Sequence, residues 1–309
     1  MTSTLQSFDA ALLAFADDVG SQGPISIAGS QTRWTLGGEL EPGTRTISAP
    51  TGIVEYTPAE MTVVVRAGTP VSELHAALAE KGQWTALPER GGTVGGAIVV
   101  GENDFRRGAR GEVRNAVLQV RYVSAEGELV TGGGPTVKNV SGFDLPRLVV
   151  GSLGTLGCLA EVTLRTNPIP ASIRWFEARN VDPFALHSLL LNPGAIMWNG
   201  DDTQVMLHGH DVDVAADVDR ILSLGAFSEI DEPQSPSGFR WSLQPSELAT
   251  LDGLDTATFV AEIGVGLLHA EKPQPPRMLS TAMTVIHERL KAEFDRTGRL
   301  NPGRTVGST

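Results

Sequence analysis

Cysteine is almost absent from this 309-residue sequence, which contains only Cys158. One cysteine excludes an internal disulfide and any iron–sulfur or metal cluster held by cysteines of this chain alone, and it fits a reducing compartment. Basic residues are also few, since 24 Lys and Arg stand against 36 Asp and Glu, a formal net charge of −12. Such a charge repels nucleic acid and anionic lipid, so we expect neither as a partner.

Long apolar runs are missing as well. No run reaches the roughly 18 residues that a membrane-spanning helix needs, so we expect no direct membrane insertion. At the N-terminus, Asp9, Asp17 and Asp18 interrupt apolar residues at helical spacing, which predicts an amphipathic helix and not a signal peptide. We therefore expect a cytoplasmic protein that would reach a membrane only through a complex.

Several common nucleotide and catalytic motifs are absent. There is no GxxxxGK[ST] loop, no GxSxG elbow, no HExxH and no EF-hand loop. The run Gly91–Gly96 reads GGTVGG and not GxGxxG, which argues against a Rossmann fold. His208 and His210 flank one glycine, but two candidate ligands without a third nearby are weak evidence, so we expect no metal.

Glycine is abundant, with 35 residues gathered mainly at 91–111, 132–134 and 142–157. Each cluster follows or precedes an expected strand. Glycine lets the backbone approach a ligand without a clashing Cβ, and main-chain N–H groups can cradle a pyrophosphate. Several separate loops therefore favour one long dinucleotide touched at several points; tight turns in a glycine-rich sheet protein are the alternative.

The order of expected elements predicts an α+β fold in two domains. The first covers 1–170, in two parts of about 1–90 and 91–170, and the break Asn167-Pro168-Ile169-Pro170 ends it. The second, 171–309, is a smaller α+β domain. Its expected strands are 172–178, 195–199, 204–208 and 258–268, and its expected helices start at Pro183, cover 212–224 and cover about 277–295.

Three runs carry a family resemblance. They are GGTVGGAIVVG, GEVRNAVLQVRYVSAEGELVTGGG and KNVSGFDLPRLVVGSLGTLGCLAEVTLRTNPIP, and the C-terminus adds a G-x-x-NPGR ending at 298–304. Together they resemble the FAD-linked oxidases, that is, the vanillyl-alcohol-oxidase-like family with a two-subdomain PCMH-type FAD-binding domain, and within it the E subunits of bacterial glycolate oxidases. The resemblance covers 24–170 and the last ten residues, and implies a small α+β cap domain whose NPGR tail returns to the flavin domain.

The resemblance also implies which residues hold FAD. The implied cofactor-binding residues are Ala28, Gly29, Ser30, Gln31, Thr32, Gly91, Gly92, Thr93, Val94, Gly95, Gly96, Lys138, Asn139, Gly142, Asp144, Gly151, Ser152, Gly154, Thr155, Gly157, Val162, Asn301 and Arg304. Ser30 stands where some relatives carry a flavin-linking histidine, so attachment should be non-covalent. Glu102 stands where small residues are usual, and a carboxylate there would weaken binding unless Arg106 or Arg107 neutralises it.

Catalytic residues are not evident. Oxidation of a 2-hydroxy acid needs a base for the hydroxyl proton and a cation for the carboxylate, and His208, His269 and Arg174 are weak candidates. The resemblance implies a second flavoprotein subunit and an iron–sulfur subunit as partners. Two functions stay open: a redox-active subunit that oxidises glycolate or D-lactate or relays electrons, and a non-catalytic FAD-binding subunit. A stand-alone sugar-lactone or alcohol oxidase uses the same fold.

Overall fold

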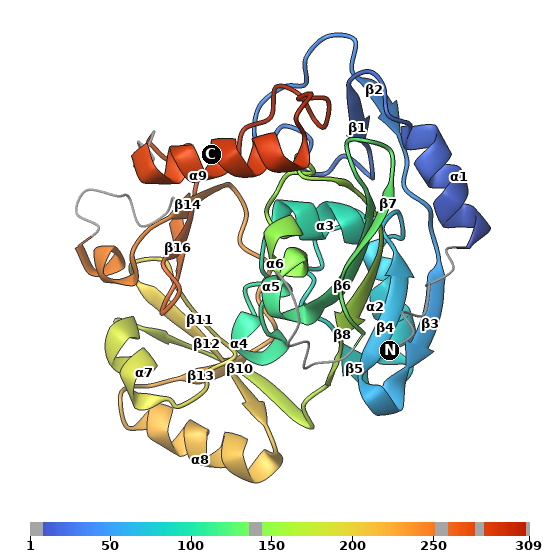
Figure 1. The fold of residues 1–309 in the computed structure, drawn as a ribbon. Helices are drawn as coiled ribbons and strands as arrows, with labels where there is room; N and C mark the ends of the chain where they lie inside the picture. The colour runs from blue at the N-terminus through green and yellow to red at the C-terminus, as the bar shows by residue number, and fades with distance from the viewer. Residues whose placement is uncertain (1–8, 136–143, 251–258, 276–280, 307–309) are drawn as a thin grey trace. The chain divides into compact units, whose positions relative to one another are not determined.

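The computed structural model describes residues 9–135, 144–250, 259–275 and 281–306 (Figure 1). Helices and strands are mixed along the chain in an α+β arrangement, which divides into two compact units. Unit 1 takes its described residues from 1–103, 112–167 and 278–308, and unit 2 from 104–111 and 168–277. Within the described residues, no helix is long and apolar enough to cross a membrane.

Unit 1 contains a five-stranded antiparallel sheet in the order β3-β4-β8-β6-β7. Its strands are β3 (Ile53–Thr57), β4 (Thr62–Arg66), β6 (Val117–Val123), β7 (Leu129–Gly133) and β8 (Cys158–Arg165). Apolar residues recur at every second position, so that Val63, Val65, Val120, Val162 and Leu164 are all buried on one core. This alternation in the sequence is why these segments form strands.

Short strands and helices surround that sheet in unit 1. They are α1 (Ala10–Val19), β1 (Ile25–Ile27), β2 (Arg45–Ile47), η1 (Pro58–Glu60), α2 (Val71–Ala79), β5 (Gln83–Trp84), α3 (Val94–Val100), α5 (Val113–Ala116), α6 (Leu145–Val149), β9 (Asn167–Pro168) and α9 (Thr281–Phe294). Asp9 caps α1 by accepting from the Leu12 amide. Thr93 caps α3 by accepting from the Gly96 amide at 3.2 Å, which starts a helix directly after a glycine loop.

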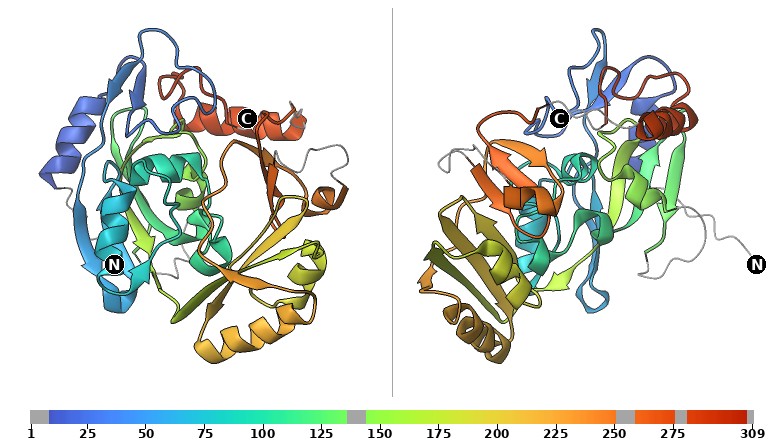
Figure 2. Two further views of the ribbon diagram at one scale, coloured as in Figure 1. Left: turned by 180° about the vertical axis from the view of Figure 1, so that it is seen from behind. Right: turned by 90° about the vertical axis from the view of Figure 1, so that its left-hand side faces the viewer.

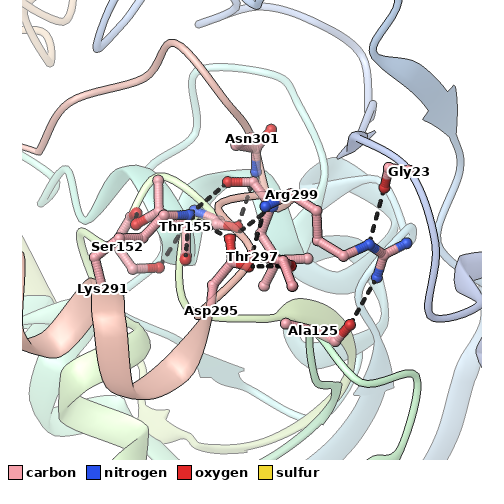
Figure 3. Close-up of polar contacts among 11 residues, drawn as sticks. Gly23, Ala125, Ser152, Thr155, Lys291, Asp295, Thr297, Arg299 and Asn301 are labelled. Carbon is pink, nitrogen blue, oxygen red and sulfur yellow. Dashed lines mark hydrogen bonds and ion pairs between the residues drawn. The ribbon is translucent and has the colours of Figure 1, made fainter.

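The C-terminal segment that follows α9 joins distant parts of unit 1 (Figure 3). Arg299 donates to five backbone carbonyls, and Leu300 pairs with Ile25 beside β1. Asp295 accepts from Lys291 Nζ at 2.6 Å, from the Leu300 amide at 2.7 Å and from the Arg299 amide at 3.0 Å. Residues separated by more than 270 positions are thereby held together.

Unit 2 contains a seven-stranded sheet in the order β13-β10-β12-β11-β15-β16-β14. Its elements are α4 (Arg107–Arg110), β10 (Ser172–Arg179), α7 (Pro183–Leu189), β11 (Ala195–Trp198), β12 (Asp202–Gly209), α8 (Asp211–Leu222), β13 (Ser228–Ile230), β14 (Phe239–Ser242), η2 (Pro245–Thr250), β15 (Phe259–Glu262) and β16 (Leu267–Ala270). The sequence predicts one strand over 258–268, but Gly264 and Gly266 at positive φ turn the chain there, and β15 and β16 form a hairpin.

The two faces of this sheet differ in chemistry. Helices α7 and α8 lie on one face of the sheet (Figure 2). Phe176, Val205 and Leu207 belong there to a single apolar core that also includes Leu186 and Ile221. The other face carries Trp175, Met206, Glu262 and His269, all buried. One face is therefore a conventional core, and the other buries ionisable groups that need partners.

Residues 104–111 provide those partners in unit 2. The Phe105 ring lies 5.8 Å from the Trp175 ring, and Arg107 Nη2 donates to Glu262 Oε2 at 3.0 Å. The Gly108 amide donates to the Gly194 carbonyl at 3.0 Å. A chain segment that is distant in sequence from the rest of unit 2 thus covers the polar face of its sheet.

Candidate functional site

Two glycine loops of unit 1 meet across two small adjoining cavities. A Cβ added at Gly29 would lie 2.4 Å from the Thr93 hydroxyl oxygen, and one added at Gly92 would lie 3.0 Å from the Thr32 hydroxyl oxygen. The loop after β1 and the loop before α3 therefore approach so closely that Gly29 has no room for a side chain. Both cavities have Gly29, Thr93 and Arg304 in their walls.

The backbone of these loops offers free hydrogen-bond donors. Gln31 has a φ of +56°, and Gly91 and Gly92 have φ of +70° and +87°. Left-handed residues of this kind expose successive amides in the concave arrangement that binds anions. Within the described part of the chain, the amides of 30–32 and 91–93 donate to no acceptor.

Three arginines add positive charge to the same walls. Arg33 follows the first loop, Arg90 precedes the second, and Arg304 reaches in from the C-terminal segment. Arg304 donates to the Trp34 carbonyl at 2.8 Å, and its guanidinium stacks on the Trp34 ring 4.5 Å from the ring centre. Burial lowers the pKa of Arg304, as expected for a cation with little solvent around it.

Two buried donors in this cluster lack partners among the described residues. They are Arg90 Nη2 and Arg304 Nε. Buried N–H groups of arginine are normally hydrogen-bonded, so these two donors are available to acceptor oxygens of a ligand. An anionic ligand with acceptor oxygens suits such donors.

Glu102 is the acidic residue of these walls. Its Oε2 accepts from Arg33 Nε at 3.0 Å and its Oε1 accepts from Arg90 Nη1. The sequence-based expectation that Arg106 or Arg107 would neutralise it is wrong, because Arg106 pairs with Asp104 and Arg107 with Glu262 in unit 2. The carboxylate is nevertheless neutralised, from within unit 1.

The residues present fit the pyrophosphate of FAD. Three cations and one carboxylate give the walls two net positive charges, which matches the two negative charges of the pyrophosphate. Free amides and orphaned guanidinium donors supply the hydrogen bonds, and the small side chains admit close contact. A bound flavin would supply hydride acceptance, which none of the protein's side chains can provide.

Most residues implied by the resemblance line these cavities. They are Ala28, Gly29, Ser30, Gln31, Thr32, Gly91, Gly92, Thr93, Gly95, Gly96, Gly154, Gly157, Asn301 and Arg304. Two hydrogen bonds fix the side-chain amide of Asn301. Its Nδ2 donates to the Gly154 carbonyl at 2.9 Å, and its Oδ1 accepts from Ser26 Oγ at 2.5 Å. The structure therefore brings the C-terminal NPGR segment and the first glycine loop to one place.

Other implied residues lie elsewhere in unit 1. Val94 is in the core at the start of α3, Val162 is buried in the middle of β8, and Asp144 caps α6 by accepting from the Arg147 amide. Gly151, Ser152 and Thr155 border a different cavity, beside α9. Lys138, Asn139 and Gly142 lie outside the described residues.

The three weak catalytic candidates all lie in unit 2, in different environments. Arg174 is held by Glu229 through two hydrogen bonds of 2.9 and 2.6 Å at an exposed edge. His269 Nε2 lies 2.8 Å from Glu262 Oε1, and both side chains are buried. His208 is half-buried and its Nε2 has no partner among the described residues; burial lowers its pKa, which keeps the ring neutral at neutral pH.

Sequence reasoning missed Arg33, Trp34, Arg90 and the bridging role of Glu102. A signal was available, because an arginine stands directly beside each glycine loop, in AGSQTR and in RGGTVGG. Cations placed next to loops that expose amides are a common sign of phosphate binding. Glu102 could not have been paired from sequence, since 69 residues separate it from Arg33.

Comparisons with known proteins identify a cofactor-binding domain in this chain. Residues 10–133 match a family model described as an FAD binding domain. A 156-residue stretch, 49% of the chain, is 36% identical to 45% of the Escherichia coli glycolate oxidase subunit GlcE. A 123-residue stretch, 38% of the chain, is 35% identical to 26% of a D-2-hydroxyglutarate dehydrogenase from Xanthomonas citri. The matched stretches thus cover less than half the length of either relative.

A solved structure of alkyldihydroxyacetonephosphate synthase shares the fold, with a TM-score of 0.66 and 13% identity over 94% of this chain and 73% of that one. The family match covers the first glycine loop and the second, the two that form the cavity walls with the arginines. The chain therefore contains an FAD binding domain over residues 10–133 and is similar there to a glycolate oxidase subunit and a D-2-hydroxyglutarate dehydrogenase.

Proposed function

We propose that this chain is an FAD-dependent oxidoreductase subunit that acts on the CH–OH group of a small 2-hydroxy acid such as glycolate or D-lactate. The observation that supports this substrate class is the pair of relatives above, both named for 2-hydroxy acids and both matching the chain. By analogy with the glycolate oxidase subunit, the chain would work in the cytoplasm beside a second flavoprotein and an iron–sulfur subunit.

The proton acceptor we propose is His208. Oxidation of an alcohol requires removal of the hydroxyl proton while the hydride leaves the adjacent carbon. A neutral imidazole with an unshared acceptor nitrogen is suited to this task, and the lowered pKa of His208 keeps it neutral. His269 is less suited, because the nitrogen that would accept the proton already contacts Glu262.

A substrate carboxylate needs a cation, and the candidates differ in availability. Arg174 is bound in two hydrogen bonds by Glu229, so a substrate would have to displace that carboxylate. Arg107 is buried against Glu262, but its Nε has no partner among the described residues. We therefore propose Arg107 over Arg174 as the carboxylate-binding cation.

The test is anaerobic titration of the FAD-loaded chain with glycolate or D-lactate. The measured quantity is the loss of the visible absorption band of oxidised flavin. Bleaching of the isolated chain supports a catalytic subunit. We expect His208→Gln to slow reduction at least 100-fold while FAD binding is unchanged. His75→Gln, at a histidine of unit 1 bound to Glu89, is the control and should have no effect.

A second function has an observation in its favour. Two of the three weak candidates, Arg174 and His269, are already held by carboxylates of the chain. That arrangement suits a subunit whose flavin site stabilises a complex without turning over. Bleaching only after partner subunits are added, unchanged by His208→Gln, would favour this alternative and contradict the catalytic proposal.

A further inference from the structure

The carboxylate of Glu102 occupies an unusual position among the walls of the FAD cavity. It follows directly on Gly101, which ends α3 at a φ of +69°. A Cβ at Gly101 would lie 2.9 Å from the backbone of Gly151, so the chain is fixed at this point. The Glu102 side chain is only 11% exposed. Its placement is therefore determined by the fold and not by a choice among surface rotamers.

Each carboxylate oxygen of Glu102 binds an arginine from a different loop. Oε2 accepts from Arg33, next to the first glycine loop, and Oε1 accepts from Arg90, next to the second. Glu102 thus bridges the two loops that form the cavity walls. The oxygens of a phosphate offer the same kind of acceptor to the same two guanidinium groups.

We propose that Glu102 is a built-in substitute for the cofactor phosphate, which holds Arg33 and Arg90 in place when FAD is absent and gives up at least one of them when FAD binds. Without the carboxylate, two guanidinium groups would face each other across an empty cavity and repel. With it, the empty loops keep their geometry, but the phosphate must compete for the arginines. Glu102 therefore stabilises the cofactor-free chain and weakens FAD binding.

One arginine of this bridge keeps a donor that Glu102 does not use. Buried arginine donors are normally hydrogen-bonded, so this donor is available to a ligand. Here Arg90 Nη2 is buried without a partner in the described part of the chain, although Glu102 binds Arg90 through Nη1. The pairing thus leaves one Arg90 donor for an incoming phosphate, which must displace Glu102 to bind Arg33 Nε and Arg90 Nη1 as well.

The test compares FAD binding by the cofactor-free chain and by Glu102→Gln, using quenching of flavin fluorescence at low ionic strength. Glutamine keeps the shape and one acceptor oxygen but removes the competing charge. We expect the variant to bind FAD about tenfold more tightly, which corresponds to about 1.4 kcal/mol. The cofactor-free variant should also melt at a lower temperature, and saturating FAD should raise its Tm by more than it raises that of the unaltered chain.

The control is Asp18→Asn, which removes the same charge from an exposed carboxylate that pairs with Arg45 in unit 1. We expect its FAD dissociation constant to equal that of the unaltered chain. Inorganic pyrophosphate serves as a second probe and should raise the Tm of Glu102→Gln more than that of the unaltered chain. Equal or weaker FAD binding by Glu102→Gln would overturn the proposal.

Glu102→Asp keeps the test decisive if the glutamine variant does not fold. Aspartate retains the charge, but it is one methylene shorter and cannot hold both arginines at once. FAD binding should therefore be tighter than in the unaltered chain, though by less than the effect of glutamine. Weaker FAD binding by Glu102→Asp would mean that the bridge helps to build the site, contrary to the proposal.

Discussion

Asp295 offers a sharp test of how the C-terminal segment holds unit 1 together. Its side chain is fully buried and receives hydrogen bonds from Lys291 Nζ, the Leu300 amide and the Arg299 amide (Figure 3). Substitution by asparagine keeps the volume but removes the charge and places an N–H₂ group against one or more of these donors. We expect Asp295→Asn to leave Lys291 without its counter-charge, although Nζ still donates to the Thr155 and Leu300 carbonyls, and to leave one amide without its acceptor.

The size of the effect follows from the exposure of the partners. Breaking a fully buried ion pair costs about 3–5 kcal/mol, because the remaining charge is buried alone. Lys291 is 32% exposed and can recover some solvent, which reduces the expected loss in the free energy of unfolding to about 2–3 kcal/mol. Urea unfolding of Asp295→Asn and of the unaltered chain measures this difference in the free energy of unfolding. The dependence of that free energy on urea concentration should be the same for both proteins.

The pH dependence supplies a second readout. Burial acts to raise the pKa of Asp295, but the hydrogen bonds from Lys291 and the two amides outweigh it and leave the pKa below its ordinary value. A carboxyl whose pKa is lowered by folding stabilises the fold above its unfolded pKa of about 3.9, and this contribution is lost as the pH falls through the lower folded value. The unfolding free energies of the two proteins should therefore converge in acid.

Asp18→Asn is the matched control, because Asp18 lies in the same unit but pairs with Arg45 at the surface. Its unfolding curve should coincide with that of the unaltered chain. If Asp295→Asn loses less than about 0.5 kcal/mol, or if its deficit persists undiminished in acid, the ionised carboxylate does not hold the segment and the reasoning fails.

Three further predictions each concern a single residue. Gly108→Ala should destabilise unit 2 by about 2 kcal/mol or more in thermal unfolding, because its Cβ would lie 2.1 Å from the Pro193 carbonyl oxygen; an unchanged Tm would contradict the packing of that segment. Cys158 should resist thiol reagents in the native chain and react on unfolding, since burial raises its pKa to about 12; rapid native labelling would count against this. Arg299→Lys should lower both Tm and FAD affinity, because lysine cannot serve five carbonyls; equal values would show that these bonds contribute nothing.

Local elements of this fold are readable from sequence where one short signal decides them. Asp182 followed by Pro183 predicts the start of a helix, and the structure has Asp182 accepting from the Phe184 amide at the first turn of α7. The alternating run at 117–123 is β6 as expected. Thr69 followed by Pro70 predicts a helix that Thr69 caps and Pro70 begins. In the structure the Thr69 hydroxyl bonds to Gly52 instead, and α2 begins at Val71 with Pro70 as its N-cap.

The candidate site also has a part that the sequence predicts and a part that it does not. A glycine cluster indicates the loop at 91–96 as a place where the backbone can approach a ligand, whereas the loop at 28–32 was implied only by the family resemblance. The partners of Glu102, by contrast, depend on contacts between residues up to 69 positions apart. No local pattern encodes such pairs, which is why the sequence suggested the nearby Arg106 or Arg107 instead.

The composition of unit 2 from two stretches of chain has a consequence for its biosynthesis. Residues 104–111 leave the ribosome well before any strand of the sheet that they cover. This segment therefore lacks its native contacts until the strands of unit 2 have been synthesised. The same order limits dissection of the protein. A fragment of 168–277 would leave Glu262 without the Arg107 guanidinium and Trp175 without the Phe105 ring, so the fragment should be poorly soluble. Addition of a peptide of 104–111 should restore its solubility.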